Sequence, residues 1–240
     1  MTESPDPTHV PLDPAWGDET VAVQAGRPAR VPGAPMNEPV TLSSTYVHTA
    51  ALEYGRDGNA GWIALETALG ALEGGRAVTF ASGLAAATAI ADLVPTGGTA
   101  LLSSVTYYGV RVIFERLAAY GRLELRFAPA DDTAAFLAAA EGADLVWVES
   151  IANPLVVLAD VPAIAARAGE LGALTVVDAT FATPLRQRPL ELGADIVMHS
   201  ATKFIGGHSD LLLGVARIAR DRRAEEEVRV AADELRRGAH

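Results

Sequence analysis

Four groups of polar residues follow directly after short apolar runs, at positions where ligands bind in α/β proteins. Ligands of open α/β sheets bind beyond the carboxyl ends of the strands, so the residue types at these points indicate the chemistry. The groups carry a hydroxyl beside glycine, a carboxylate, an amine among hydroxyls and an amide beside proline: Ala81-Ser82-Gly83, Asp178, His199-Ser200-Ala201-Thr202-Lys203 and Glu149-Ser150-Ile151-Ala152-Asn153-Pro154.

The Ser82-Gly83 pair stands between a strand expected at 77–80 and a helix expected at 84–94. Small residues at this point let backbone N–H groups approach an anion at the positive end of the helix dipole, as a phosphate site requires. Taken alone, the pair is explained more simply by a serine N-cap and a glycine turn.

Asp178 and Lys203 could supply acid, base or covalent chemistry. A carboxylate at the edge of an apolar sheet needs a cationic or protonated partner, such as a protonated ring nitrogen, to offset its desolvation. A desolvated lysine near another cation has a lowered pKa and becomes a nucleophile for carbonyl compounds. As an isolated residue, Asp178 is more often a turn or capping residue, and a lone lysine such as Lys203 is nearly always a solvated surface charge.

The remaining polar residues carry weaker signals. Asn153 could donate to a ligand oxygen and Pro154 fixes its loop, although an ordinary turn explains both residues equally well. The spacing of His199, His208 and Asp210 matches no metal-ligand pattern, so no metal site is predicted.

The apolar pattern predicts an α/β fold that positions these groups. We expect strands at 77–80, 100–103, 123–128, 145–149, 174–178 and 196–199, with helices between most of them. Near-continuous apolar strands are buried on both faces, which predicts a mostly parallel sheet between helical layers. We expect residues 1–60 to form an extended N-terminal arm with a short helix near 19–25. Residues 61–220 are expected to form the α/β domain, and 221–240 a C-terminal helix, amphipathic over 222–237.

Composition excludes several classes of function. The formal net charge of −11 gives no basis for binding nucleic acid or an anionic membrane. The chain has no cysteine, which excludes disulfides and thiolate chemistry. Its N-terminus lacks the pattern of a secretory signal, and the apolar stretch at 84–94 is too short to cross a bilayer, so we expect a cytoplasmic protein.

Ten segments in order resemble one family: TVAVQAG, PVTLSSTY, YGRDGN, LEGG, FASGLAA, YYG, VESIANP, VDATFATP, GADIVMHSATKF and GGHSD. From about residue 20 to 237 the chain resembles the fold-type-I pyridoxal-phosphate enzymes of cysteine and methionine metabolism, namely cystathionine γ-synthase, cystathionine γ-lyase and methionine γ-lyase. The resemblance implies the large domain of a fold-type-I transferase with pyridoxal 5'-phosphate as cofactor. It also implies elimination or replacement at Cβ or Cγ of a sulfur-containing or γ-substituted amino acid.

The resemblance also implies residue roles. Lys203 matches the lysine that holds the cofactor covalently and later moves protons, and Asp178 matches the partner of the pyridine nitrogen. Tyr108 matches a tyrosine that stacks on the cofactor ring and acts on the leaving group, and Asn153 a residue near the ring hydroxyl. The positions that match the family's phosphate site are Ser82, Gly83, Leu84, Ser200 and Thr202, together with Tyr54 and Arg56 supplied by a neighbouring subunit.

This chain departs from the family at several points. The family usually has Asn-Pro-Thr at residues 59–61, Asn at Ala179 and a second Gly at Val110. Its members continue into a smaller C-terminal domain whose arginine grips the substrate carboxylate. We therefore expect a homo- or hetero-oligomer, with the smaller domain either supplied by a separate chain or lost by truncation. The alternative is a non-catalytic scaffold subunit of a full-length paralogue.

Overall fold

The computed structural model describes residues 10–47, 52–218 and 230. Apart from Val230, the helix expected at 222–237 lies outside the described residues. No helix within the described part of the chain has both the length and the apolar character needed to cross a membrane.

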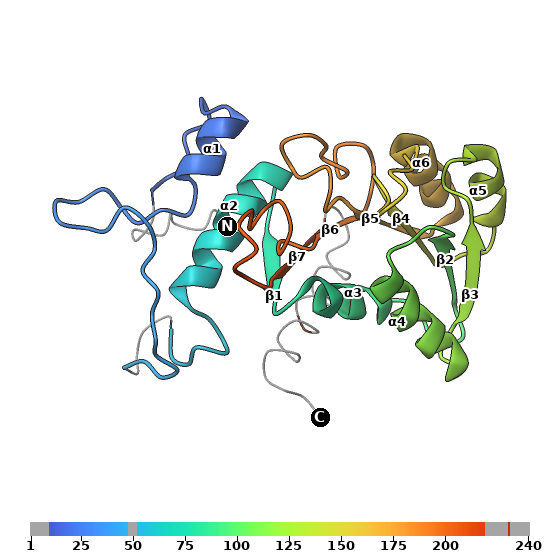
Figure 1. The fold of residues 1–240 in the computed structure, drawn as a ribbon, viewed down its shortest axis with the longest axis horizontal. Helices are drawn as coiled ribbons and strands as arrows, with labels where there is room; N and C mark the ends of the chain where they lie inside the picture. The colour runs from blue at the N-terminus through green and yellow to red at the C-terminus, as the bar shows by residue number, and fades with distance from the viewer. Residues whose placement is uncertain (1–9, 48–51, 219–229, 231–240) are drawn as a thin grey trace.

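The described residues form one seven-stranded, mostly parallel sheet in the order β1-β7-β6-β5-β4-β2-β3 (Figure 1). Strands β2 to β6 pair in parallel, and β7 lies antiparallel between β1 and β6. The strands are β1 Ala77–Phe80, β2 Thr99–Ser103, β3 Glu124–Ala128, β4 Leu145–Glu149, β5 Leu174–Asp178, β6 Ile196–His199 and β7 Gly214–Ile218.

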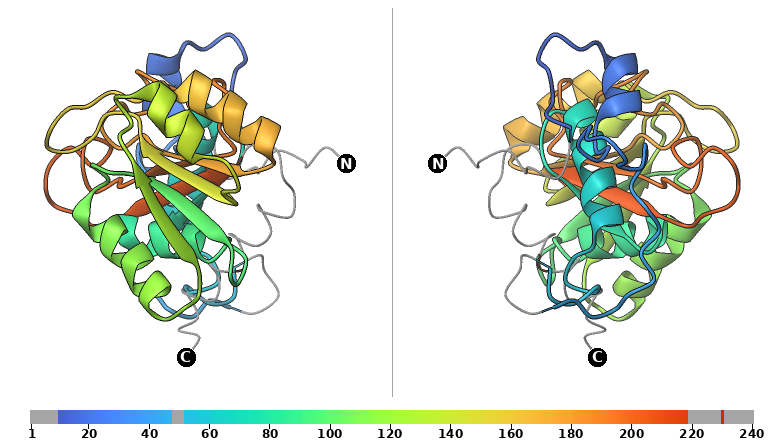
Figure 2. Two further views of the ribbon diagram at one scale, coloured as in Figure 1. Left: turned by 90° about the vertical axis from the view of Figure 1, so that its right-hand side faces the viewer. Right: turned by 90° about the vertical axis from the view of Figure 1, so that its left-hand side faces the viewer.

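Helices cover both faces of the sheet, as both panels of Figure 2 show. The helices are α1 Asp18–Gln24, α2 Ala60–Glu73, α3 Gly83–Ala91, α4 Tyr108–Ala119, α5 Thr133–Ala139 and α6 Val161–Leu171. Helices α3 and α4 bury residues such as Phe114 against one face, where Phe114 meets Trp147 of β4 edge-on at 5.9 Å. Helices α5 and α6 bury Phe136 and Ile164 against the other face. All five residues of β4 are buried, as expected for a strand covered on both sides.

The apolar pattern predicted the central strands well. Strands β1, β4, β5 and β6 have the predicted bounds, while β2 and β3 begin one residue away from them. Strand β7 was not predicted. Its five residues include Arg217, whose guanidinium donates to the carbonyl of Gly74, so the strand lacks a continuous apolar run.

The N-terminal segment before α2 is largely irregular, apart from α1. It lies close to α2, since a Cβ at Gly26 would stand 2.0 Å from the carbonyl oxygen of Ala64. Asp18 of α1 forms an ion pair with Arg188 in the segment between β5 and β6. The segment therefore contacts both α2 and the main body of the molecule.

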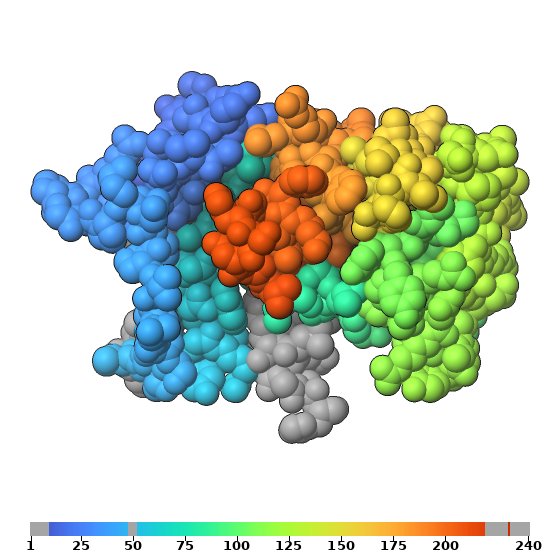
Figure 3. All heavy atoms as spheres, in the orientation of Figure 1, coloured from blue at the N-terminus to red at the C-terminus, as the bar shows by residue number. Residues whose placement is uncertain are grey.

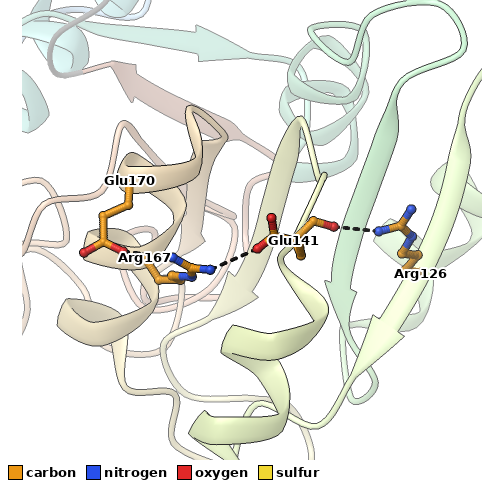
Figure 4. A network of polar contacts seen from close by, with 4 residues as sticks. All are labelled: Arg126, Glu141, Arg167 and Glu170. Carbon is orange, nitrogen blue, oxygen red and sulfur yellow. Dashed lines mark hydrogen bonds and ion pairs between the residues drawn. The ribbon is translucent and has the colours of Figure 1, made fainter.

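A chain of polar contacts crosses the surface near β3 and α6 (Figure 4). Arg167 binds Glu141 and Glu170 at 2.9 and 3.0 Å, and Arg126 donates to the carbonyl of Glu141 at 2.9 Å. These side chains are well exposed, so the contacts add little stability individually.

Candidate active site

A cavity of about 200 Å³ opens at the carboxyl ends of β4, β5 and β6, beside the N-terminus of α3. Eight of the eleven residues expected at the site line it: Ser82, Gly83, Leu84, Asn153, Asp178, Ser200, Thr202 and Lys203. The other lining residues are Tyr107, Val110, Glu149, Ile151, Thr180, Phe181, Met198 and Leu212. The fold thus brings the four polar groups of the sequence to one place.

The N-terminus of α3 supplies the anion-binding end of the cavity. Ser82 is the N-cap, and its Oγ accepts a hydrogen bond of 3.1 Å from the N–H of Ala85. The N–H groups of the first turn, those of Gly83 and Leu84, precede the helix's own hydrogen bonds, so a helix end of this kind can bind an anion. A Cβ at Gly83 would lie 2.8 Å from Cβ of Ser200, so glycine is what allows the two segments to approach this closely.

Asp178 supplies a buried carboxylate at the end of β5. Its Oδ1 accepts hydrogen bonds from the backbone N–H and the hydroxyl of Thr180 at 2.9 and 2.5 Å. The same hydroxyl oxygen accepts the N–H of Ser200 at 2.8 Å, which joins Asp178 to the segment that carries the lysine. Burial raises the pKa of Asp178, against the lowering effect of Thr180 and of the charge of His199.

His199 forms a buried pair with Glu73 near the cavity. Its Nε2 lies 2.6 Å from Oε1 of Glu73, and both side chains are 1% exposed. The sequence places His199 in the polar group that contains Lys203 and gives it no role as a metal ligand. In the structure it belongs to the contact between α2 and β6, and its charge acts on Asp178.

Lys203 lies in the segment between β6 and β7, with an exposed side chain at the edge of the cavity. It also lines a neighbouring hollow together with Phe204 and Asp210. In Figure 3 this segment, coloured orange to red, lies at the centre of the visible face. Thr202 is held to the backbone of Leu213, because its hydroxyl accepts from the N–H at 2.9 Å and lies 3.2 Å from the carbonyl oxygen.

Glu149, at the end of β4, was missed as a site residue. It is 6% exposed, and its two oxygens accept the N–H groups of Tyr107 and Asn153, the latter at 3.1 Å. Burial, and to a lesser extent the charge of Asp178, raises the pKa of Glu149 from 4.5 to about 7, against the lowering effect of these bonds. The signal was present in the sequence, since Glu149 ends the apolar run LVWV as Asp178 ends LTVV.

Three expected residues do not line this cavity. Tyr108 is 77% exposed at the start of α4, whereas its neighbour Tyr107 lines the cavity. Tyr54 and Arg56 line a separate hollow near residues 38–44, where the guanidinium of Arg56 lies 4.7 Å from the centre of the Tyr54 ring. Leu212 lines both hollows, so the two are adjacent.

The residues present fit a phosphorylated pyridine aldehyde. A helix N-terminus could hold the phosphate, and the approach of Gly83 to Ser200 leaves no room for a side chain there. The buried carboxylate of Asp178, with its raised pKa, would be stabilised by a protonated ring nitrogen. Lys203 supplies an amine at the same cavity.

Comparison with known proteins points to the same chemistry. The model of the Cys/Met metabolism PLP-dependent enzyme family matches residues 19–236. The chain is 40% identical over 215 residues to a probable cystathionine gamma-synthase of Herpetosiphon aurantiacus, covering 86% of this chain and 67% of that protein. It is 41% identical over 211 residues to a putative cystathionine gamma-lyase of Streptomyces coelicolor, covering 83% of this chain and 53% of that protein.

Solved structures are similar as well. The cystathionine gamma synthase of Xanthomonas oryzae pv. oryzae, in complex with cystathionine, superposes with a TM-score of 0.83 at 33% identity. The match covers 92% of this chain and 59% of that one. The chain thus spans between about half and two thirds of the length of the relatives it matches.

Proposed function

Because the chain belongs to the family of Cys/Met metabolism PLP-dependent enzymes, we propose that its cavity binds pyridoxal phosphate for elimination or replacement at Cβ or Cγ of an amino acid. The substrate class is a sulfur-containing or γ-substituted amino acid, in keeping with the cystathionine gamma-synthase and gamma-lyase names of the relatives. One observation carries the proposal: an amine, a buried carboxylate and a helix N-terminus meet at one cavity of about 200 Å³.

The roles proposed for these groups follow from their chemistry. When bound, the cofactor supplies an electron-withdrawing pyridinium ring conjugated to the substrate's α-carbon. Asp178, ionised, would hold the proton on the ring nitrogen, and the N–H groups of Gly83 and Leu84 would bind the phosphate. Nζ of Lys203 would take the proton from the α-carbon. Tyr108, which would act on the leaving group, is exposed at the start of α4, next to Tyr107, which lines the cavity.

The substrate's carboxylate needs a further anchor. Among the described residues that line the cavity there is no arginine, although a guanidinium is the side chain best suited to a carboxylate. We propose that the anchor comes from a segment beyond the family's large domain, on a further part of the protein or on another chain of an oligomer. The share of the relatives' length that this chain spans supports the proposal.

The sequence makes the covalent test unusually clean, because Lys203 is its only lysine. The remaining basic side chains are arginines and histidines, which do not condense with aldehydes as a lysine amine does. We expect the purified chain with pyridoxal phosphate to show a visible absorption band that borohydride removes, leaving one added pyridoxyl group on the peptide that contains Lys203.

Two variants control this experiment. Lys203→Ala removes the amine, while Lys203→Arg keeps the positive charge and cannot be reduced onto the cofactor. Both should lose the added mass, and any mass that persists in them reports the terminal amine. Labelling of the terminal amine alone in the unmutated chain would contradict the proposal.

A further inference from the structure

Glu149 joins two loops that both line the cavity. One of its oxygens accepts the N–H of Tyr107, the N-cap residue of α4, and the other accepts the N–H of Asn153 in the loop after β4. Tyr107 and Asn153 both line the cavity. Tyr107 makes no side-chain capping hydrogen bond of its own. The carboxylate of Glu149, at the end of β4, lies instead at the positive end of α4.

We propose that Glu149 is a positioning residue: its ionised carboxylate fastens the Tyr107–Tyr108 turn and the Asn153 loop in place around the cofactor, and protonation releases one of them. The inference rests on the proposed cofactor site, because it assigns these loops their roles. It concerns the chain's own hydrogen bonds, however, and these exist with or without cofactor.

The release follows from hydrogen-bond chemistry. An ionised carboxylate accepts at both oxygens, whereas a protonated one turns one oxygen into an O–H donor, which faces an N–H poorly. For Glu149 this protonation falls near neutral pH, since its pKa is raised to about 7. One loop therefore loses its acceptor as the pH falls through this value.

Other charged groups act on the same carboxylate and must be controlled. Asp178 is its register partner on β5 and favours its protonation, and His199 of β6 acts on Asp178 in turn. Lys203 and Tyr107 line the same cavity. If the pH dependence of the amide hydrogen bonds reports Glu149, it should persist in Asp178→Asn. Its midpoint should move to lower pH, because this substitution removes a negatively charged neighbour of Glu149.

The test is amide hydrogen exchange at Tyr107 and Asn153 in the full chain without cofactor, at pH 6 and pH 8, corrected for the intrinsic exchange rate. For local opening in which Glu149 stays buried, we expect at least one of the two amides to be about tenfold more protected at pH 8, as one charge-assisted hydrogen bond implies. Glu149→Gln should abolish this difference, because the amide offers only one accepting oxygen and its NH₂ faces the second N–H. Glu170→Gln, at an exposed carboxylate paired with Arg167, should behave like the unmutated chain.

Two further measurements keep the test decisive. Glu149→Asp keeps the charge on a shorter side chain and should retain pH-dependent protection at one amide. The second measurement is the affinity for pyridoxal phosphate as a function of pH. The change in affinity around pH 7 should disappear in Glu149→Gln and remain in Glu170→Gln.

The outcomes separate the two proposals. Equal protection at both pH values in the unmutated chain, or a pH dependence that persists in Glu149→Gln, would overturn the role of Glu149 even if the cofactor binds. If the cofactor does not bind while the exchange pattern is as expected, the proposed function fails and the fastening of the loops stands.

Discussion

At the scale of single residues, the unusual feature is a pair of buried carboxylates, Glu149 and Asp178, opposite one another on β4 and β5. Burial raises the pKa of both, because little nearby charge compensates for lost water. For Asp178 the proposed compensation is the protonated ring nitrogen of the cofactor. Glu149 instead relies on two backbone N–H groups, which do not fully offset its burial.

This imbalance predicts how stability depends on pH. Glu149 has a pKa of about 7 when folded and 4.5 as its ordinary value, so between these values the folded state binds a proton that the unfolded state has released. The free energy of unfolding should therefore fall as the pH rises from about 4.5 to about 7, by about 3 kcal/mol from this residue. Glu149→Gln should show a correspondingly shallower decline in urea unfolding measured between pH 4.5 and 8.

The raised pKa of Asp178 contributes a decline of the same sign, so the comparison needs a second variant. Asp178→Asn should also flatten the profile, and it should lower the pH at which the remaining decline levels off. Superimposable profiles for Glu149→Gln and the unmutated chain would show that Glu149 is not protonated preferentially in the folded state.

The same pair shows what the sequence could and could not predict at this scale. The sequence predicts Asp178 as a site residue because a carboxylate after an apolar strand requires a partner, and Asp178 lines the cavity. Glu149 satisfies the same criterion, yet its partners are backbone N–H groups of distant loops, which no side-chain pattern reveals. Tyr107 and Tyr108 are adjacent in sequence, so only the geometry at the start of α4 distinguishes them.

At the scale of elements, the anion-binding end of the site depends on how closely α3 approaches the segment after β6. A Cβ at Gly83 would lie 2.8 Å from Cβ and 2.9 Å from Oγ of Ser200, closer than side chains pack. Gly83→Ala should therefore displace Ser200 from the helix N-terminus. We expect affinity for pyridoxal phosphate to fall at least tenfold, with a stability loss of about 1–3 kcal/mol from overpacking. Absorbance titration and urea unfolding measure the two effects.

Gly169, inside α6, is the matched control for this substitution. A Cβ there would meet nothing within 4 Å, so Gly169→Ala should stabilise the chain by about 0.5–1 kcal/mol through helix propensity alone. Its cofactor affinity should not change. Undiminished affinity in Gly83→Ala would show that the approach of Ser200 to α3 is not required for binding.

Prediction of the elements succeeded where burial on both faces gives a continuous apolar run, as in Leu145–Glu149 and Leu174–Asp178. It failed for Gly214–Ile218, which starts at a glycine packed against the backbone of Ser82 and carries Arg217 on the strand. A Cβ at Gly214 would lie 2.2 Å from the carbonyl oxygen of Ser82. The start of this strand therefore depends on its close contact with Ser82, which an apolar sequence pattern does not reveal.

At the scale of the whole molecule, the N-terminal segment carries apolar side chains that the rest of its own chain leaves exposed. Val40 and Leu42 are 88% and 97% exposed, and Tyr54 and Arg56 lie in a hollow apart from Lys203. Exposed apolar side chains of this kind favour a further protein surface. The resemblance assigns Tyr54 and Arg56 to the phosphate of a neighbouring subunit, and in their own chain these residues line the hollow adjacent to the cavity and not the cavity itself.

This assignment predicts that two defective chains repair each other. Arg56→Ala should weaken cofactor labelling at limiting pyridoxal phosphate, because the phosphate loses a guanidinium, and Lys203→Ala should abolish labelling altogether. In a mixed pair, the Arg56→Ala chain contributes Lys203 while its partner contributes Arg56, which completes one site. Random pairing in equal amounts should restore about a quarter of the unmutated number of complete sites, as expected for a twofold-symmetric pair.

The measurement is borohydride labelling of the Arg56→Ala chain, alone and after unfolding and refolding together with the Lys203→Ala chain. The double variant carrying both substitutions is the control partner, since it offers no Arg56 and should restore nothing. Labelling that stays unchanged on mixing, or that the double variant restores equally, would place Arg56 outside the neighbouring site. Restoration by Lys203→Ala alone requires that the side chain of Arg56 act on the cavity of another chain, because in that pair no single chain holds both residues.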